Sequence, residues 1–289
     1  MTKEERYKAG QSQMKFYYSN LYLDWRYVEV LTINNIVNKF DIVYDEYKND
    51  KEMIINGWYY EAMAQTIQSI EDLFSMVFYS KDVEWFAKSV IHYNASEIKK
   101  KIEKYECKDI NKLCEDFRIP YLNMSIEWPV QDTYDFVKKS LIFIQDSISN
   151  IIIFYKKYYK DYCQYKHGMS VALSKFGNKK WDDNFQIGSL MSFFRDGTKN
   201  KNFSKNINDG LGIYLVPETQ KHLKELSNED NLLTFEIKVI KMDEMLRITK
   251  TNCNLMKMLW ENILNQIDEK SNDKFYLIDP DSYSLYEIS

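Results

Sequence analysis

Lys160, Asp161 and His167 form the group of residues in this sequence with the clearest chemical potential. They lie in the segment "KDYCQYKHG", where six residues separate the lysine from the histidine. On a helix, positions seven residues apart share one face, so Lys160 and His167 would lie together. His167 could act as a general acid or base near neutral pH, and Lys160 could hold an anion. The alternative is that His167 caps the end of its helix by interacting with the last carbonyl groups.

The surroundings of this group are basic, although the chain as a whole is acidic. Residues 156–205 contain ten Lys and one Arg against four Asp, whereas the full chain has a formal net charge of −4. A basic segment in an acidic protein is a candidate anion-binding surface, and the alternative is a solvated loop. Lysines can neutralise phosphates and aromatic rings can stack on bases. We therefore predict RNA contacts at Lys156, Tyr159, Lys166, Lys179 and Lys180.

The elements that must position these residues are helices. Only 8 Gly and 4 Pro occur in 289 residues, which favours long helices over many turn-linked strands. Apolar residues recur at steps of three and four, the period of a helix with one buried face. Long helices are predicted over about 12–48, 59–77, 134–165 and from Ser227 or Asn228 to Ile267. Shorter amphipathic helices are predicted near 82–92, 96–105 and 109–117.

The pattern changes after Gly168, which lies where a helix-ending glycine is expected. The short apolar runs "MSVAL", "GSLMSFF" and "GLGIYLV" predict strands, and the tail after residue 273 predicts a terminal strand or an ordered arm. No linker rich in Gly, Ser or Pro divides the chain. We expect a mainly α fold: a bundle of long antiparallel helices in a single domain, 1–289, with a small β-hairpin or sheet inserted at about 169–216.

The segment "KDYCQYKHG" at the end of a long helix resembles the Arg-x(4–6)-His motif of the HEPN superfamily. HEPN domains are helical bundles common in prokaryotic defence and toxin–antitoxin systems, and many are metal-independent ribonucleases. The resemblance matches His167 to the family's histidine and Asp161 to the polar residue that follows the arginine. Lys160 stands where the family has arginine. A lysine presents one compact charge instead of a planar fork, so it would orient a phosphate less well.

Two functions follow from this pattern. The first is an RNA-binding protein or a metal-independent endoribonuclease that works in prokaryotic defence or a toxin–antitoxin system, with His167, Lys160 and Asp161 at its catalytic site. The alternative is a non-catalytic helical module for interaction or dimerisation, whose site is degenerate. We expect RNA as one partner, and a second copy or another protein as the other.

Further features limit the remaining chemistry. The chain has no H-E-x-x-H motif and no carboxylate cluster with ligand spacing, so we predict no metal and no cofactor. The four cysteines lack C-x-x-C spacing and are expected to be free thiols. No apolar run reaches about 18 residues, and the first residues have no apolar signal core. A cytoplasmic protein without membrane contact is therefore predicted.

Overall fold

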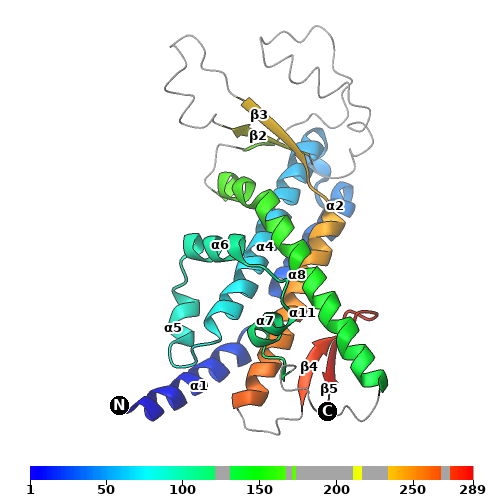
Figure 1. Cartoon of the computed structure of the whole chain (residues 1–289). Coiled ribbons are helices and arrows are strands. Elements are labelled where there is room, and N and C mark those ends of the chain that lie inside the picture. Colours follow the sequence, from blue (N-terminus) through cyan, green and yellow to red (C-terminus); the bar gives the residue numbers. More distant parts are fainter. Residues whose placement is uncertain (121–130, 167–170, 174–210, 217–233, 268–273, 289) are drawn as a thin grey trace, which may run out of the picture. The chain divides into compact units, whose positions relative to one another are not determined.

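A computed structural model describes residues 1–120, 131–166, 171–173, 211–216, 234–267 and 274–288. These residues are mainly helical and include two small antiparallel sheets (Figure 1). The mainly α fold class predicted from the periodicity is confirmed.

The chain packs into two compact units, each assembled from segments that are distant in sequence. The first unit comprises residues 1–28, 66–157 and 247–289, and the second comprises residues 29–65 and 158–246. Three long helices each contribute residues to both units: α4 (Lys51–Tyr79), α8 (Gln131–Lys166) and α11 (Met242–Ile267). The single-domain assignment stays a prediction.

The predicted helix over 12–48 is wrong, because four shorter elements occupy the start of the chain. They are α1 (Lys3–Ser19), α2 (Trp25–Asn38), α3 (Phe40–Val43) and the 3₁₀ helix η1 (Asp45–Asp50). A capping box between Thr2 and Glu5 starts α1. Asn20 ends it: its backbone N–H donates to the Tyr17 carbonyl at 3.2 Å, and its side-chain amide donates to the Phe16 carbonyl at 2.7 Å. The apolar repeat continues across this break, so periodicity alone does not reveal it.

The other predicted helices are present, with some changes at their ends. Helix α4 begins at Lys51, earlier than expected, and α8 covers the predicted range 134–165. The short helices are α5 (Phe86–Ile91), α6 (Ala95–Lys104) and α7 (Ile110–Asp116). Asn94 and Asp109 start the last two, because each side chain accepts a hydrogen bond from a backbone N–H two residues later.

A three-stranded antiparallel sheet in the second unit follows the order β1-β2-β3. Strands β1 (Val171–Leu173) and β2 (Leu211–Val216) confirm two of the predicted strands, whereas "GSLMSFF" lies outside the described residues. Strand β3 (Thr234–Val239) corrects the predicted start of the last long helix. Its Phe235 and Val239 are four residues apart, a spacing that suits both a helix face and one side of a strand. This segment is a strand because it pairs with β2, where Ile213 lies opposite Ile237.

The second sheet is a hairpin in the first unit, where a terminal strand or an ordered arm was predicted. It joins β4 (Phe275–Ile278) to β5 (Leu285–Ile288), with Phe275 opposite Ile288. The Asp279 carboxylate shapes the connecting turn, since it accepts hydrogen bonds from the Asp281 N–H at 3.0 Å and from the Ser282 hydroxyl at 2.6 Å.

Helix α11 lies at the centre of the first unit's core. From Thr251 to Trp260 every residue except Lys257 is buried. Two hydrogen-bonded pairs lie inside this core: the Asn252 amide donates to the Ser69 hydroxyl at 2.8 Å, and the Thr249 and Thr66 hydroxyls lie 3.1 Å apart. Apolar residues of the predicted helix repeats lie inside the protein: Ile144, Ile148 and Trp260 are buried, and Leu246 is half-buried.

Candidate functional site

The last turns of α8 carry three of the five residues predicted to contact RNA: Lys156, Tyr159 and Lys166. Lys156 and Lys160 are exposed, and Tyr159 and Cys163 are half-buried. Because these positions follow the helical spacing of three, four and seven residues, they share one face of the helix. We call these four residues the α8 stripe. Lys166, one turn further on, is exposed, and its ammonium group lies 5.8 Å from the centroid of the Tyr162 ring.

The remaining tyrosines of this segment hold the helix in place. Tyr155, Tyr158 and Tyr162, which follow the helical repeat predicted over 134–165 and which we call the tyrosine seam, are buried. In the first unit, the Tyr155 hydroxyl donates to the buried Glu71 carboxylate at 3.1 Å. These rings are therefore not available for stacking on bases, and Tyr159 is the aromatic residue that the stripe offers.

Tyr165 is fixed separately within the second unit. Its ring stacks on Tyr60 with centroids 5.5 Å apart, and its hydroxyl donates to Glu61 at 3.1 Å. Burial, followed by the neighbouring Glu61 carboxylate and the hydrogen bond to it, raises the pKa of Tyr165 to about 12. Tyr165 is thus a neutral hydrogen-bond donor at physiological pH.

Asp161, predicted as a catalytic residue, lies on the buried side of the helix. It is 1% exposed and has an interaction partner in the fold, whereas its neighbour Lys160 is exposed. Because Asp161 is buried and Lys160 is exposed, the two side chains point in different directions. Asp161 can support the helix from within, but it does not lie on the α8 stripe. His167, Lys179 and Lys180 lie outside the described residues, so the pairing of Lys160 with His167 stays a prediction.

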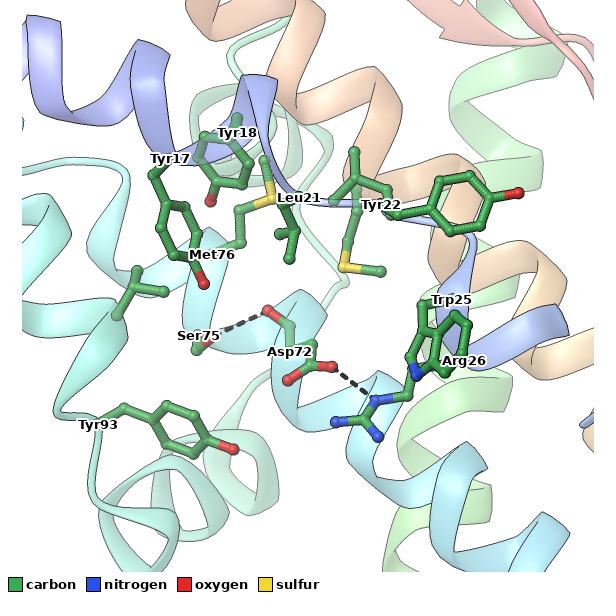
Figure 2. Close-up of a pocket in the computed structure, with 13 residues that line it drawn as sticks. Tyr17, Tyr18, Leu21, Tyr22, Trp25, Arg26, Asp72, Ser75, Met76 and Tyr93 are labelled. Carbon is green, nitrogen blue, oxygen red and sulfur yellow. Dashed lines mark hydrogen bonds and ion pairs between the residues drawn. The ribbon is translucent and has the colours of Figure 1, made fainter. Parts of the chain in front are cut away.

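A pocket in the first unit was not predicted from the sequence. Figure 2 shows aromatic side chains around a cavity of about 210 Å³, where the end of α1 and the start of α2 meet α4. We call it the aromatic pocket, after its five aromatic lining residues: Tyr17, Tyr18, Tyr22, Trp25 and Tyr93. The sequence signal was "YYSNLYLDW", which is dense in aromatics, but the mistaken continuous helix concealed the bend that brings them together.

Arg26 and Asp72 form an ion pair in the wall of the aromatic pocket. The Arg26 Nε donates to Asp72 Oδ2 at 3.2 Å, and the two side chains are 28% and 36% exposed. Burial raises the pKa of Asp72, and the charge and hydrogen bond of Arg26 offset only part of that rise. Burial first, and then the Asp72 charge, raise the pKa of Tyr17, so its hydroxyl stays neutral beside the carboxylate.

The cysteines do not supply a nucleophile in the core. All four are free, as predicted, and Cys107, Cys114 and Cys253 are buried. Burial is the main cause that raises the pKa of each of these three thiols to about 12, so they stay protonated and unreactive. Within the described ranges, no three His, Cys, Asp or Glu residues are grouped closely enough to bind a metal ion. None of the helices that the structure describes is long and apolar enough to cross a membrane.

Comparison of the chain with protein-family models, with curated proteins and with solved structures finds no match.

Proposed function

We propose that the protein binds RNA through the α8 stripe. The observation that carries this proposal is the exposure of Lys156 and Lys160 on one face of the helix, with the half-buried Tyr159 on the same face. The carboxylate closest in sequence, that of Asp161, is buried and does not lie on this face. The resemblance to HEPN domains adds the biological setting of a prokaryotic defence or toxin–antitoxin system.

Binding would depend on phosphate contacts and on one stacking platform. The two lysines would neutralise phosphates of the RNA backbone, and such contacts weaken steeply as salt is added. Tyr159 would stack on a base, a contact worth about 1–3 kcal/mol where it forms. Neither contact reads a sequence, so the proposal is for RNA binding with little sequence preference.

The catalytic form of the proposal adds His167. In this form His167 removes the proton from the 2′-hydroxyl, Lys160 holds the scissile phosphate and no metal ion takes part. The 2′-oxygen bonds to phosphorus to give a 2′,3′-cyclic phosphate, the phosphorus–oxygen bond to the leaving nucleotide breaks, and the leaving 5′-oxygen takes a proton from solvent water. The support for this form is the HEPN-like spacing of Lys160 and His167.

The test is RNA binding and cleavage by the full chain at low salt in the presence of a metal chelator. We expect the double variant Lys156→Ala/Lys160→Ala to bind single-stranded RNA about tenfold more weakly or worse. The slope of log K against log salt concentration should become shallower by about 0.7 for each lost phosphate contact. Lys138→Ala is the matched control, because Lys138 is exposed on the same helix outside the stripe. The control should bind like the parent chain.

The outcomes separate the two functions. Cleavage that His167→Ala abolishes, with binding retained, supports the endoribonuclease. Binding by the parent without cleavage supports an RNA-binding protein with a degenerate site, an outcome that the separation of Asp161 from Lys160 favours. A parent chain that neither binds nor cleaves RNA at low salt contradicts the proposal and leaves the non-catalytic interaction module.

A further inference from the structure

We propose that the aromatic pocket is a binding site for a small, uncharged, planar ring that carries an N–H group, such as a pyrimidine-type heterocycle. This proposal rests on residues of the first unit and does not depend on RNA binding by the α8 stripe. Three properties of the pocket lead to it: its size and aromatic walls, an unused hydrogen-bond acceptor, and the balance of charge.

The cavity matches one ring system in size and shape. Its volume of about 210 Å³ lies below the about 300–1,000 Å³ that is typical of sites for drug-sized ligands. Tyr18, Met76 and Met256 are almost completely buried and form its deep part. Tyr22 and Trp25 are 61% and 53% exposed and form its entrance. Flat rings stack on or pack edge-to-face against such walls, so a planar ligand would contact them well.

The hydrogen-bond acceptor is the second carboxylate oxygen of Asp72. Oδ2 accepts from Arg26, whereas Oδ1 accepts no hydrogen bond from any residue in the described part of the chain. In Figure 2 this second oxygen points away from Arg26, on the side where Tyr93 lies. An ionised carboxylate only accepts hydrogen bonds, so the ligand group that complements Oδ1 is a donor such as N–H.

The charge of the pocket argues for an uncharged ligand. Arg26 and Asp72 lie side by side in the lining, so their formal charges cancel. A cationic ligand would be attracted by the aromatic rings but repelled by the Arg26 guanidinium. An anionic ligand would be repelled by the Asp72 carboxylate. A neutral ring with an N–H donor avoids both conflicts.

The first experiment measures binding of small probes to the full chain by ligand-observed NMR and tryptophan fluorescence. We expect uracil and thymine to bind, because both keep their N–H groups. We expect 1,3-dimethyluracil, which has the same ring without an N–H, to bind about tenfold more weakly or worse, the loss typical of a hydrogen bond to a charged group. Tetramethylammonium and benzoate should not bind. Equal binding of uracil and 1,3-dimethyluracil, or no binding of uracil up to its solubility limit, would overturn the proposal.

Variants then locate the binding site. Trp25→Ala should weaken uracil binding about threefold to tenfold, the effect of one aromatic contact. Trp85→Ala is the matched control, because Trp85 is 50% exposed in the same unit but does not line the pocket. Its variant should bind uracil like the parent. Unchanged uracil binding in a folded Trp25→Ala variant would place the ligand elsewhere and contradict the proposal.

Two further variants test the ion pair. Asp72→Ala should abolish the preference for uracil over 1,3-dimethyluracil, because the acceptor is gone. Arg26→Ala should still bind uracil and should newly bind tetramethylammonium, since the pocket would then carry an unbalanced carboxylate. Both side chains are partly exposed, so we expect folded variants, which circular dichroism will check. A preference for uracil that survives Asp72→Ala would rule out Oδ1 as the acceptor.

Discussion

The central part of α11 and the last turns of α8 share a sequence period but have different environments. In both, apolar or aromatic residues recur at steps of three and four. In α11, residues 251–260 are buried on all sides except at Lys257. In α8, residues 156–166 bury tyrosines on one side and expose Lys156, Lys160 and Lys166. The comparison shows that the residues between the seam positions decide whether a helix lies inside a core or at a surface.

The physical reason is the difference in cost between burying an amide and burying a charge. Asn252 and Asn254 of α11 are buried because partners within the fold accept their amide hydrogens, Ser69 at 2.8 Å and the Tyr283 carbonyl at 2.6 Å. A lysine ammonium group would need a paired charge to be buried in the same way, so the lysines of α8 stay in water.

The largest expected effect comes from shortening the same residue type in the two environments. Ile263→Ala in α11 should lower the free energy of unfolding by about 2–5 kcal/mol, because Ile263 is 3% exposed and its loss leaves a cavity. Ile153→Ala in α8 should change it by less than about 0.5 kcal/mol, because Ile153 is 63% exposed. Urea unfolding of both variants measures the difference. Equal losses would break the comparison.

Replacing a buried asparagine should lower the free energy of unfolding less than replacing a buried isoleucine, but more than replacing an exposed asparagine. Asn262 accepts from the Tyr276 N–H at 2.7 Å and donates to the carbonyls of Tyr276 and Phe117, so it fixes β4 to α11. Asn262→Ala should cost about 1–3 kcal/mol, because these backbone groups lose their partner inside the protein.

Asn265→Ala is the control for this prediction. Among the described residues, Asn265 makes one hydrogen bond, at 3.3 Å and exposed to solvent, to the Lys274 carbonyl before β4. Thermal unfolding should separate the two variants, with Asn265→Ala close to the parent protein. A neutral Asn262→Ala variant would show that β4 is held without this amide.

The smallest effect should come from Tyr165, at the edge of the lysine-rich end of α8. The folded-state pKa of Tyr165 is raised to about 12, above the ordinary value of about 10 for tyrosine. The stability that neutral Tyr165 contributes is therefore complete below pH 10 and is lost as the pH rises towards 12. Tyr165→Phe should cost less than about 1 kcal/mol at neutral pH, because the site is partly exposed.

The alkaline measurement sharpens this prediction. Between pH 10 and pH 12 the parent should lose stability more steeply than Tyr165→Phe, since ionised Tyr165 would face the Glu61 carboxylate. Tyr7→Phe, at an exposed tyrosine, should follow the parent. Parallel pH profiles for the parent and Tyr165→Phe would mean that the contact with Glu61 is not maintained in solution.

The sequence predicted α4 and α8 well, because their apolar repeats extend over many turns. It missed the end of α1, where Asn20 supplies the cap without any Gly or Pro to mark it. It also missed β3, whose apolar spacing is compatible with both periods. In each case a local hydrogen bond or a partner strand decides the conformation, and periodicity does not contain that information.

The candidate sites divide in the same way. The exposure of Lys156 and Lys160 follows from their position off the tyrosine seam, so the sequence was sufficient to find the stripe. The burial of Asp161 depends on which side of α8 is packed, and sequence position alone placed it beside Lys160. The aromatic pocket needs Asp72, which comes 46 residues after Arg26 and meets it only through the tertiary fold.

The contacts of α11 with α4 also constrain how quickly the first unit can form. The hydroxyl pair Thr66–Thr249 and the hydrogen bond from Asn252 to Ser69 each join residues 183 positions apart. Closing so long a loop costs chain entropy before the contacts that stabilise it can form. Folding slows as the mean sequence separation of contacting residues grows. During synthesis, α4 leaves the ribosome long before the helix that completes its packing. Its apolar face must therefore remain without its final partner until α11 has been made, and this interval is when the nascent chain is most open to aggregation or to capture by a chaperone.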